Sequence, residues 1–476
     1  MRHSFVFAAA LLLPAASAQA DPPPLFAPNI PAYLQALTHS TDPAAKAIRQ
    51  RIAAGPADLT RERALAEKDG IVTRADQLAQ PLPPADKNAA LLYTQLDALR
   101  KRKPLTYLPG TEMMTLRNSY SPAQISALQT MIEARPDIFA LLHTAAAKPQ
   151  CVFPSDPANP FDFPEEYNGM RENARELRLE STLLGFQGKY PEAADNQLLG
   201  FRLTAHATSA PKMIGFYVGS AIDAIAVTSL QDILARAGPN AALDRKVSAD
   251  ILALPPLSLA HVLGGEPART DAEFAIFRHA SPAELADALQ LSGLQTAPPA
   301  AAFTPAEQAE LNLLLDAAEA DYLHQMRQII PAADSSRTRH TVFTAAEARA
   351  EANSGDPIQT LSDKLNPVVV TARIMGAMPT LGGLEQQIVQ VAARRLVAAA
   401  GASVSAAKAQ SGAFPANLPA QFVDPFTTKP LGYRLEGTNG FVVYSPGSDG
   451  SFDGGKPGDK RDNRQVVFRY PLGLVP

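Results

Sequence analysis

The chain has 476 residues, which is long enough for two or three domains with apolar cores of their own. Its 43 Lys and Arg residues and 47 Asp and Glu residues give a formal net charge of −4, with no dense run of basic residues. This composition argues against proteins that bind nucleic acid or anionic membranes. Cys151 is the single cysteine, so no disulfide can form within the chain. We interpret it as a buried thiol rather than a catalytic one.

The first residues have the layout of a cleaved secretory signal. Arg2 supplies an early positive charge, Phe5–Ala16 forms a short apolar core, and Ala18–Ala20 supplies small residues for the cleavage site. This core is too short to span a bilayer, and the Pro-rich stretch after Asp21 favours a mature N-terminus over a buried helix. No later segment looks long and apolar enough to be a transmembrane helix. We therefore expect a signal peptide over residues 1–20 and a periplasmic or secreted protein.

Residues 21–350 have the pattern of an α-helical domain. Apolar residues recur at helical spacing between Ile214 and Ile233, and Gly238 ends that run. Three other helix starts share one design, in which a hydroxyl caps the helix, Pro occupies the first turn, and Glu or Gln reaches back to the cap. These starts are at Ser121, Ser281 and Thr304. The pattern predicts a stack of helical hairpins.

One of these hairpins is faintly similar to a tetratricopeptide unit. Gly188–Ala193 reads GKYPEA, like the turn and second-helix start of such a unit, and the faint similarity covers about residues 165–235. No second copy appears at a fixed period, so an ordinary pair of antiparallel helices is the favoured interpretation. A helical stack with a concave face would suit binding to another protein.

The periodicity changes near the C-terminus. Residues 351–380 are interpreted as a linker, followed by a long helix over Leu384–Gln410 that Gly412 ends. Alternating apolar residues then predict a strand at Leu431–Leu435, and short apolar runs predict a second strand at Phe441–Tyr444 and a third at Val466–Phe468. The sequence therefore predicts a mainly α protein with a small α+β module over residues 381–476.

The order of short motifs in this module resembles the globular domain of type II secretion major pseudopilins. The motifs are Phe414–Leu418, Asp424–Phe426, Pro430–Tyr433 and Ser445–Gly450. The module is also similar to the tails of a loose set of exported bacterial proteins of unknown function. True pseudopilins begin with a membrane-spanning helix that polymerises, whereas this chain has a signal-like start and a long helical body. We therefore expect a monomeric or partner-bound module rather than assembly into a pilus.

The resemblance implies a structural calcium ion in the loop that follows the second strand. Asp449 stands at a matching position, and the carbonyl of Pro446 is the corresponding backbone ligand. Asp459 and Asp462 are the candidates for the later carboxylates, although their alignment with the family is loose.

The residues of this loop leave two interpretations open. Asp449 and Asp453 are spaced by Gly and Ser, as suits a hard cation that takes oxygen ligands, but Lys460 stands where an EF-hand would have its closing Glu. Basic residues interleave with the carboxylates and could instead pair with them in a solvated loop. They are Lys456, Lys460, Arg461 and Arg464.

No motif identifies a reaction. Ser405 and Lys408 match a Ser-x-x-Lys pattern, but the partner motifs of penicillin-recognising enzymes are absent, and the histidines have no ligand spacing. Two function classes remain: an exported non-catalytic scaffold that binds a partner, which we favour, and an exported hydrolase whose site lies in the helical domain. Converging acidic groups and His with shifted pKa values in a pocket would favour the enzyme, and an apolar groove would favour the scaffold.

Overall fold

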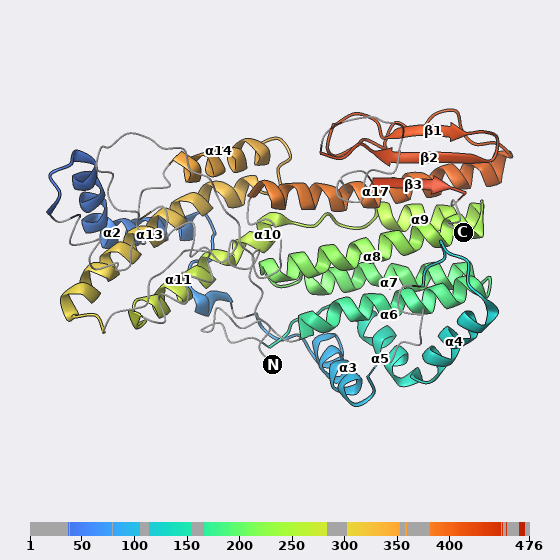
Figure 1. Cartoon of the computed structure of the whole chain (residues 1–476), viewed down its shortest axis with the longest axis horizontal. Coiled ribbons are helices and arrows are strands. Elements are labelled where there is room, and N and C mark those ends of the chain that lie inside the picture. The colour runs from blue at the N-terminus through green and yellow to red at the C-terminus, as the bar shows by residue number, and fades with distance from the viewer. Residues whose placement is uncertain are drawn as a thin grey trace.

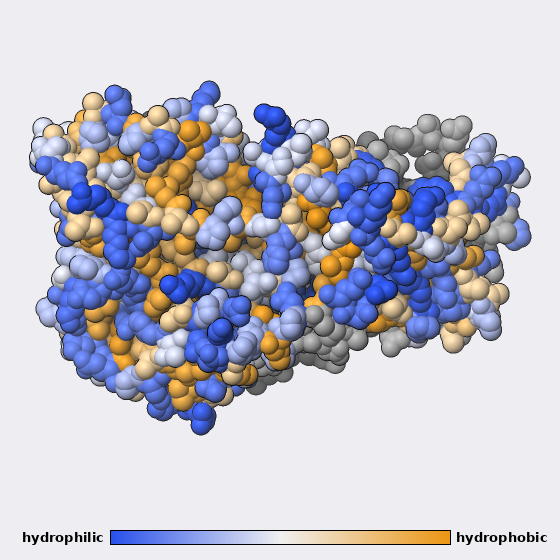
Figure 2. Space-filling view, turned by 180° about the vertical axis from the view of Figure 1, so that it is seen from behind, coloured by the Kyte–Doolittle hydropathy of each residue, from blue (hydrophilic) through white to orange (hydrophobic). Residues whose placement is uncertain are grey.

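The computed structural model describes residues 37, 39–78, 80–104, 114–154, 166–282, 302–352, 358, 381–448, 450, 454 and 466–471. The molecule is elongated and mostly helical, with a small sheet at one end (Figure 1). Helix α17 runs along one side and passes from the half that contains α13 and α14 to the half that contains the sheet. Seen from behind, hydrophobic residues reach the surface in several places on the wider half of the molecule (Figure 2).

Most of the described chain before the sheet is helical. The first part of the chain contributes α2 (Pro43–Lys68), the 3-10 turn η1 (Ala75–Leu78), α3 (Ala90–Arg102), α4 (Pro122–Glu133) and α5 (Pro136–Ala146). The next contributes α6 (Glu166–Phe186), α7 (Tyr190–Ala207), α8 (Met213–Ala237), α9 (Ala241–Leu252), α10 (Leu259–Gly264) and α11 (Glu266–Phe277). They are followed by α13 (Pro305–Ala332), α14 (Arg339–Ala352) and α17 (Leu381–Ser411).

Two of the three predicted helix starts are confirmed with their caps. The Ser121 hydroxyl accepts the amide of Gln124 at the start of α4, and the Gln124 side chain accepts the Ser121 amide in return. Thr304 and Glu307 make the same reciprocal pair at the start of α13. The helix expected after Ser281 lies outside the described residues beyond position 282.

The antiparallel pair predicted around Gly188 is present as α6 and α7. Gly188 adopts a positive φ of 75° at the turn, a conformation that glycine reaches without steric cost. Ala193 and Ala194 are fully buried in α7, and a Cβ on Gly200 would lie 2.8 Å from the Cβ of Ala226 on α8. Small residues therefore allow α7 and α8 to approach closely, and α6 contacts both of them.

Helix α8 corrects one expectation from the sequence. It is long and apolar enough to cross a membrane by length and composition, whereas no such segment was expected. In the structure, 72% of its most apolar window is buried inside the protein, and the helix packs against α6, α7 and α17. A helix that is apolar on all sides is the expected composition of a central core helix.

The C-terminal module has the predicted elements. Strands β1 (Gly432–Glu436), β2 (Gly440–Ser445) and β3 (Val466–Tyr470) form one antiparallel sheet in the order β1-β2-β3. Helix α17 is described from Leu381, close to the predicted start near Leu384, and the amide of Gly382 donates to the Glu347 carboxylate of α14 at 2.8 Å. The helix ends where Gly412 adopts a positive φ of 77°. Most of the predicted linker over 351–380 lies outside the described residues.

The apolar core continues from the helical body into this module. One cluster of buried residues joins Ile233 of α8 and Val247 of α9 to Val397 of α17 and Phe441 of the sheet. Phe468 of β3 lies directly on Gly401, where a Cβ would come within 2.5 Å of the ring. The change from helical to strand-like periodicity after Gly412 therefore marks a change of secondary structure, and the elements on both sides of it share one core.

Asp244 lies where α9 meets α17 and the end of β3, and its side chain is fully buried. Its carboxylate accepts the amide of Asn240 at 2.9 Å, so it closes the first turn of α9. Burial raises its pKa to about 6, and the Ser405 hydroxyl and the Asn240 amide oppose this increase.

We expect Asp244 to make the stability depend on pH. Because its pKa is higher in the folded state, its contribution is largest below the ordinary pKa of about 3.9 and is lost as pH rises through 6. The free energy of unfolding of the wild type, measured with urea, should fall by up to about 3 kcal/mol over this pH range. That of Asp244→Asn should not show this fall. Asp250→Asn, at a half-exposed position of the same helix, should keep the wild-type dependence. Identical pH profiles for wild type and Asp244→Asn would contradict this assignment.

Candidate functional groove

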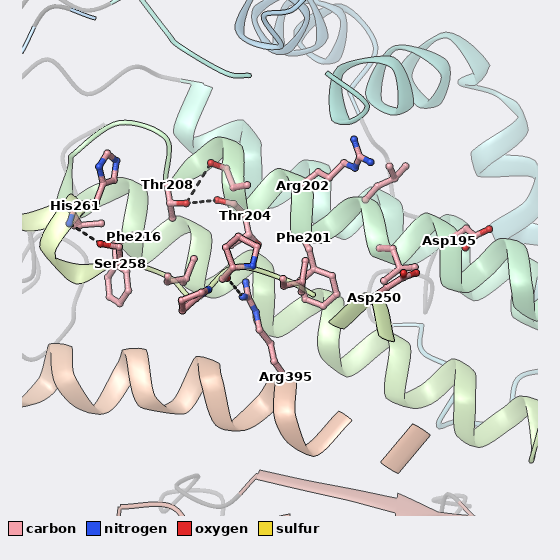
Figure 3. Close-up of a pocket in the computed structure, with 18 of the residues that line it drawn as sticks. Asp195, Phe201, Arg202, Thr204, Thr208, Phe216, Asp250, Ser258, His261 and Arg395 are labelled. Atoms are coloured by element: carbon pink, nitrogen blue, oxygen red, sulfur yellow. Dashed lines mark hydrogen bonds between the residues drawn. The ribbon is translucent and has the colours of Figure 1, made fainter. Parts of the chain in front are cut away.

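A cavity of about 730 Å³ lies where α7 faces α9, α10 and the connection between them (Figure 3). We call it the groove. Its walls are mainly apolar, and Ala205, Pro255 and Pro256 on its edges are exposed, so it opens to solvent. The other apolar lining residues are Leu198, Leu199, Phe201, Phe216, Leu254, Leu257 and Val262.

Arg395 of α17 forms the floor of the groove and connects three parts of the fold. Its Nε and Nη2 atoms donate to Oδ2 of Asp223 on α8 at 2.7 and 2.6 Å. Nη1 donates to the carbonyl of Pro255 at 2.9 Å, and the guanidinium lies 5.5 Å from the ring centre of Phe201 (Figure 3). Asp223 is fully buried, and this burial raises its pKa against the opposing effect of Arg395. The arginine therefore fixes the connection after α9 against α8.

The threonine hydroxyls of the groove are already engaged within α7, and the Ser258 hydroxyl donates to Asp334 at 2.6 Å. Thr204 donates to the carbonyl of Gly200 at 3.2 Å, and Thr208 donates to the carbonyl of Thr204 at 3.0 Å. Pro255 and Pro256 have no N–H group to offer a ligand. These threonines and prolines therefore offer a ligand no free hydrogen-bond donor, and the interior of the groove presents mainly apolar surface.

The charged residues lie around the rim. Lys246 donates to Asp195 at 2.7 Å and to Asp250 at 2.9 Å, and the hydrogen bond with Asp195 is the main reason that its pKa is raised. Arg202 is exposed, and among the described residues it has no hydrogen-bond or ion-pair partner. Its guanidinium lies well apart from Arg395 and from both carboxylates (Figure 3).

At the other end, His261 takes part in a hydrogen bond with the carbonyl of Ser209 at 3.1 Å through Nε2. Its amide is capped by the Ser258 hydroxyl at 2.9 Å, which starts α10. The ring is exposed and has no carboxylate partner among the residues that the structure describes. The imidazole is thus not arranged as the base of a catalytic pair.

The candidate calcium ligands fall mostly beyond what the structure describes. Asp449, Asp453, Asp459 and Asp462 lie outside the described residues, whereas Pro446 is buried directly after β2. The described part of the chain contains no cluster of three or more His, Cys, Asp or Glu residues suited to a metal ion. The calcium site therefore stays a prediction.

Sequence analysis did not single out Asp424 by its chemistry. It is fully buried, and it accepts the Ser445 hydroxyl at 2.6 Å and the Thr427 hydroxyl at 2.8 Å. Ser445 is the last residue of β2, so this carboxylate organises the base from which the loop begins. The only signal in the sequence was the Asp-Pro-Phe motif, whose Asp is a common turn residue.

The other candidate chemical groups are structural where they are described. Cys151 is 1% exposed, which confirms the prediction of a buried thiol. Ser405 is buried, whereas Lys408 donates to the carbonyl of Gly412 at 2.6 Å and lies over the ring of Phe414. The Ser-x-x-Lys match is therefore not a hydrogen-bonded pair.

The groove itself was missed by sequence reasoning. Its walls come from α7, α9, α10 and α17, and Arg395 is 172 positions from Asp223 in the chain. The Leu254–Leu257 stretch, with two prolines between apolar residues, was the one local signal of an exposed apolar edge. Comparison with protein-family models, with curated proteins and with solved structures finds no match to this chain.

We expect Arg395→Met to be strongly destabilising, by about 3–5 kcal/mol, because it leaves a buried carboxylate without its partner. Adding Asp223→Asn removes that charge and should recover a large part of the loss. The free energies of unfolding of the four proteins in this double-mutant cycle can be measured with urea. A loss below about 1 kcal/mol for Arg395→Met would mean that the floor of the groove does not depend on this pair.

Proposed function

We propose that the protein is an exported, non-catalytic scaffold that binds its partner in the groove. The observation that supports this most is the apolar interior of the groove, in which the lining hydroxyls and the guanidinium of Arg395 are already engaged. Sites of this kind recognise apolar groups by burial, and polar groups at the edge set orientation. Export is inferred from the signal-like sequence of residues 1–20.

The hydrolase alternative has less support from the groove. Its rim carboxylates, Asp195 and Asp250, both hold Lys246. Burial raises the pKa of both Glu266 and Glu273, but these residues of α11 do not line the groove and are at most 4% exposed. A shifted pKa without access to a substrate does not favour a catalytic role.

We also propose that the C-terminal module is pseudopilin-like and is stabilised by calcium. Two observations support this: α17 packs on a three-stranded antiparallel sheet, and the connection between β2 and β3 begins and ends at paired residues, Ser445 and Val466. Asp449 and Asp462 each stand four positions beyond that pair in the sequence. An ion held between the two arms would lower the entropic cost of closing a Gly-rich loop.

We expect the neutral dye N-phenylnaphthylamine to bind the groove with increased fluorescence. Ala205→Glu places a carboxylate on the exposed wall of α7 and should abolish most of this signal, because a charge in the groove opposes burial of an apolar ring. Ala242→Glu makes the same change at an exposed position in α9 that does not line the groove, and should leave the signal intact. Equal binding by both variants would place the dye elsewhere and remove the support for a binding groove.

We expect calcium to raise the thermal stability of the full chain. Binding to the folded state alone should add about 2.7 kcal/mol at a hundredfold excess over Kd, and a chelator should reverse it. Asp449→Ala should remove the effect, whereas Asp86→Ala, at an exposed position before α3, should retain it. A melting temperature unchanged by calcium would leave the salt-bridged loop as the better interpretation.

A further inference from the structure

We propose that Glu273 of α11 carries a proton in the folded protein, and that loss of this proton loosens the attachment of α11 to α13. Glu273 is 4% exposed and makes no hydrogen bond and no ion pair with any described residue. An ionised carboxylate in such a place loses its hydration without compensation, whereas the neutral acid is far less costly to bury. This sensitivity to pH concerns the fold itself, and it stands whether or not the groove binds a partner.

Two buried carboxyl groups share one face of α11. Glu266, Arg269 and Glu273 stand at positions i, i+3 and i+7 of the helix, and all three are at most 5% exposed. Oε1 of Glu266 accepts the amide of Met213 at 2.9 Å, and its Oε2 lies 3.9 Å from Nε of Arg269. A negative charge on Glu266 is therefore compensated, whereas a second negative charge on Glu273 would not be.

The pKa shifts of the two glutamates agree with this difference. Burial raises the pKa of Glu273 well above its ordinary value; the charge of Arg269 opposes the increase, and that of Glu266 adds to it. Burial also raises the pKa of Glu266, but Arg269, the Met213 amide and Lys212 all oppose that increase. The surroundings of Glu273 therefore favour the neutral acid more strongly than those of Glu266 do.

The charged side chains that α13 and α2 bring to α11 are already paired. Glu319 of α13 accepts from Arg63 of α2 at 2.5 Å and from Arg278 at 2.6 Å. Burial is the main cause that raises the pKa of Tyr322 on α13, so its hydroxyl stays neutral. Neither helix thus supplies Glu273 with a compensating cation among the described residues.

The other neighbours of α11 leave Glu273 in the same condition. Asp76 of η1 is exposed and of the wrong sign, and His261 of α10 is exposed and interacts with a backbone carbonyl. Lys212, which precedes α8, acts on Glu266 rather than on Glu273. The proton is therefore the compensating partner of this carboxylate.

Helix α11 also supports the part of the fold that forms one end of the groove. It follows α10 directly, and a Cβ on Gly265 between them would lie 2.2 Å from the carbonyl oxygen of Pro211. Glu266 holds the amide of Met213, the first residue of α8. An ionised Glu273 regains water only if α11 moves away from its neighbours. We therefore expect α10 and α11 to open locally as the pH rises.

Amide hydrogen exchange of the full-length protein between about pH 5 and pH 7 tests this inference. Because Glu273 is protonated when α11 is docked and ionised when α11 is open, each pH unit should lower the protection factor of α11 by a further tenfold. Glu273→Gln resembles the neutral acid, so it should fold normally and remove one factor of ten per pH unit. Burial also raises the pKa of Asp271 and Glu319, so some dependence should remain. Glu310→Gln, at an exposed position of α13, is the matched control and should behave as the wild type.

A second measurement detects the proton directly. At pH 7, the infrared difference spectrum between the wild type and Glu273→Gln should contain the carbonyl stretch of one protonated carboxylic acid. Absence of this band, or the same pH dependence of exchange in both proteins, would overturn the inference. Weaker protection of α11 in Glu273→Gln than in the wild type at pH 7 would also overturn it, because it would show that the ionised carboxylate holds the helix. None of these measurements involves binding in the groove, so the proposed function is tested separately.

Discussion

The structure depends on one constraint: helix α17 is buried from two sides. The helical body packs on it through α8 and α9, and the sheet packs on it through β2 and β3. Such a helix needs small residues where a neighbour approaches closely, as at Gly401 under Phe468, and any charge on it must be compensated. Arg395 is the buried charge that this arrangement creates, and Asp223 compensates it.

The same pairing explains the character of the groove. Because Arg395 is used by Asp223 and by the Pro255 carbonyl, the deepest cation of the groove is withdrawn from a ligand. The threonines of α7 are likewise engaged with helix carbonyls. What is left for recognition is apolar surface inside and Arg202 outside. The internal hydrogen bonds that stabilise the walls therefore also determine which chemistry the groove can bind.

Much of the local structure could be predicted because its causes lie within a few residues. Ser121 and Thr304 cap their helices through hydrogen bonds with the residue three positions later. Gly412 ends α17 by adopting a positive φ. The short apolar run around Val443, after a turn rich in glycine, was sufficient to predict β2. The long helix predicted from about Leu384 is described from Leu381, and the Gly382 amide donates there to Glu347, a contact with a distant helix that the local pattern does not specify.

The sequence by itself determined the mainly helical class, the two capped helix starts, the antiparallel pair around Gly188 and the small C-terminal sheet. These features depend on side-chain periodicity and on turn chemistry, which act over a few positions along the chain. Only the tertiary structure decided that the body and the module share one core, that the apolar helix α8 is internal, and that a groove lies above Arg395. Each of these depends on contacts between helices far apart in sequence, which pattern and spacing alone do not specify.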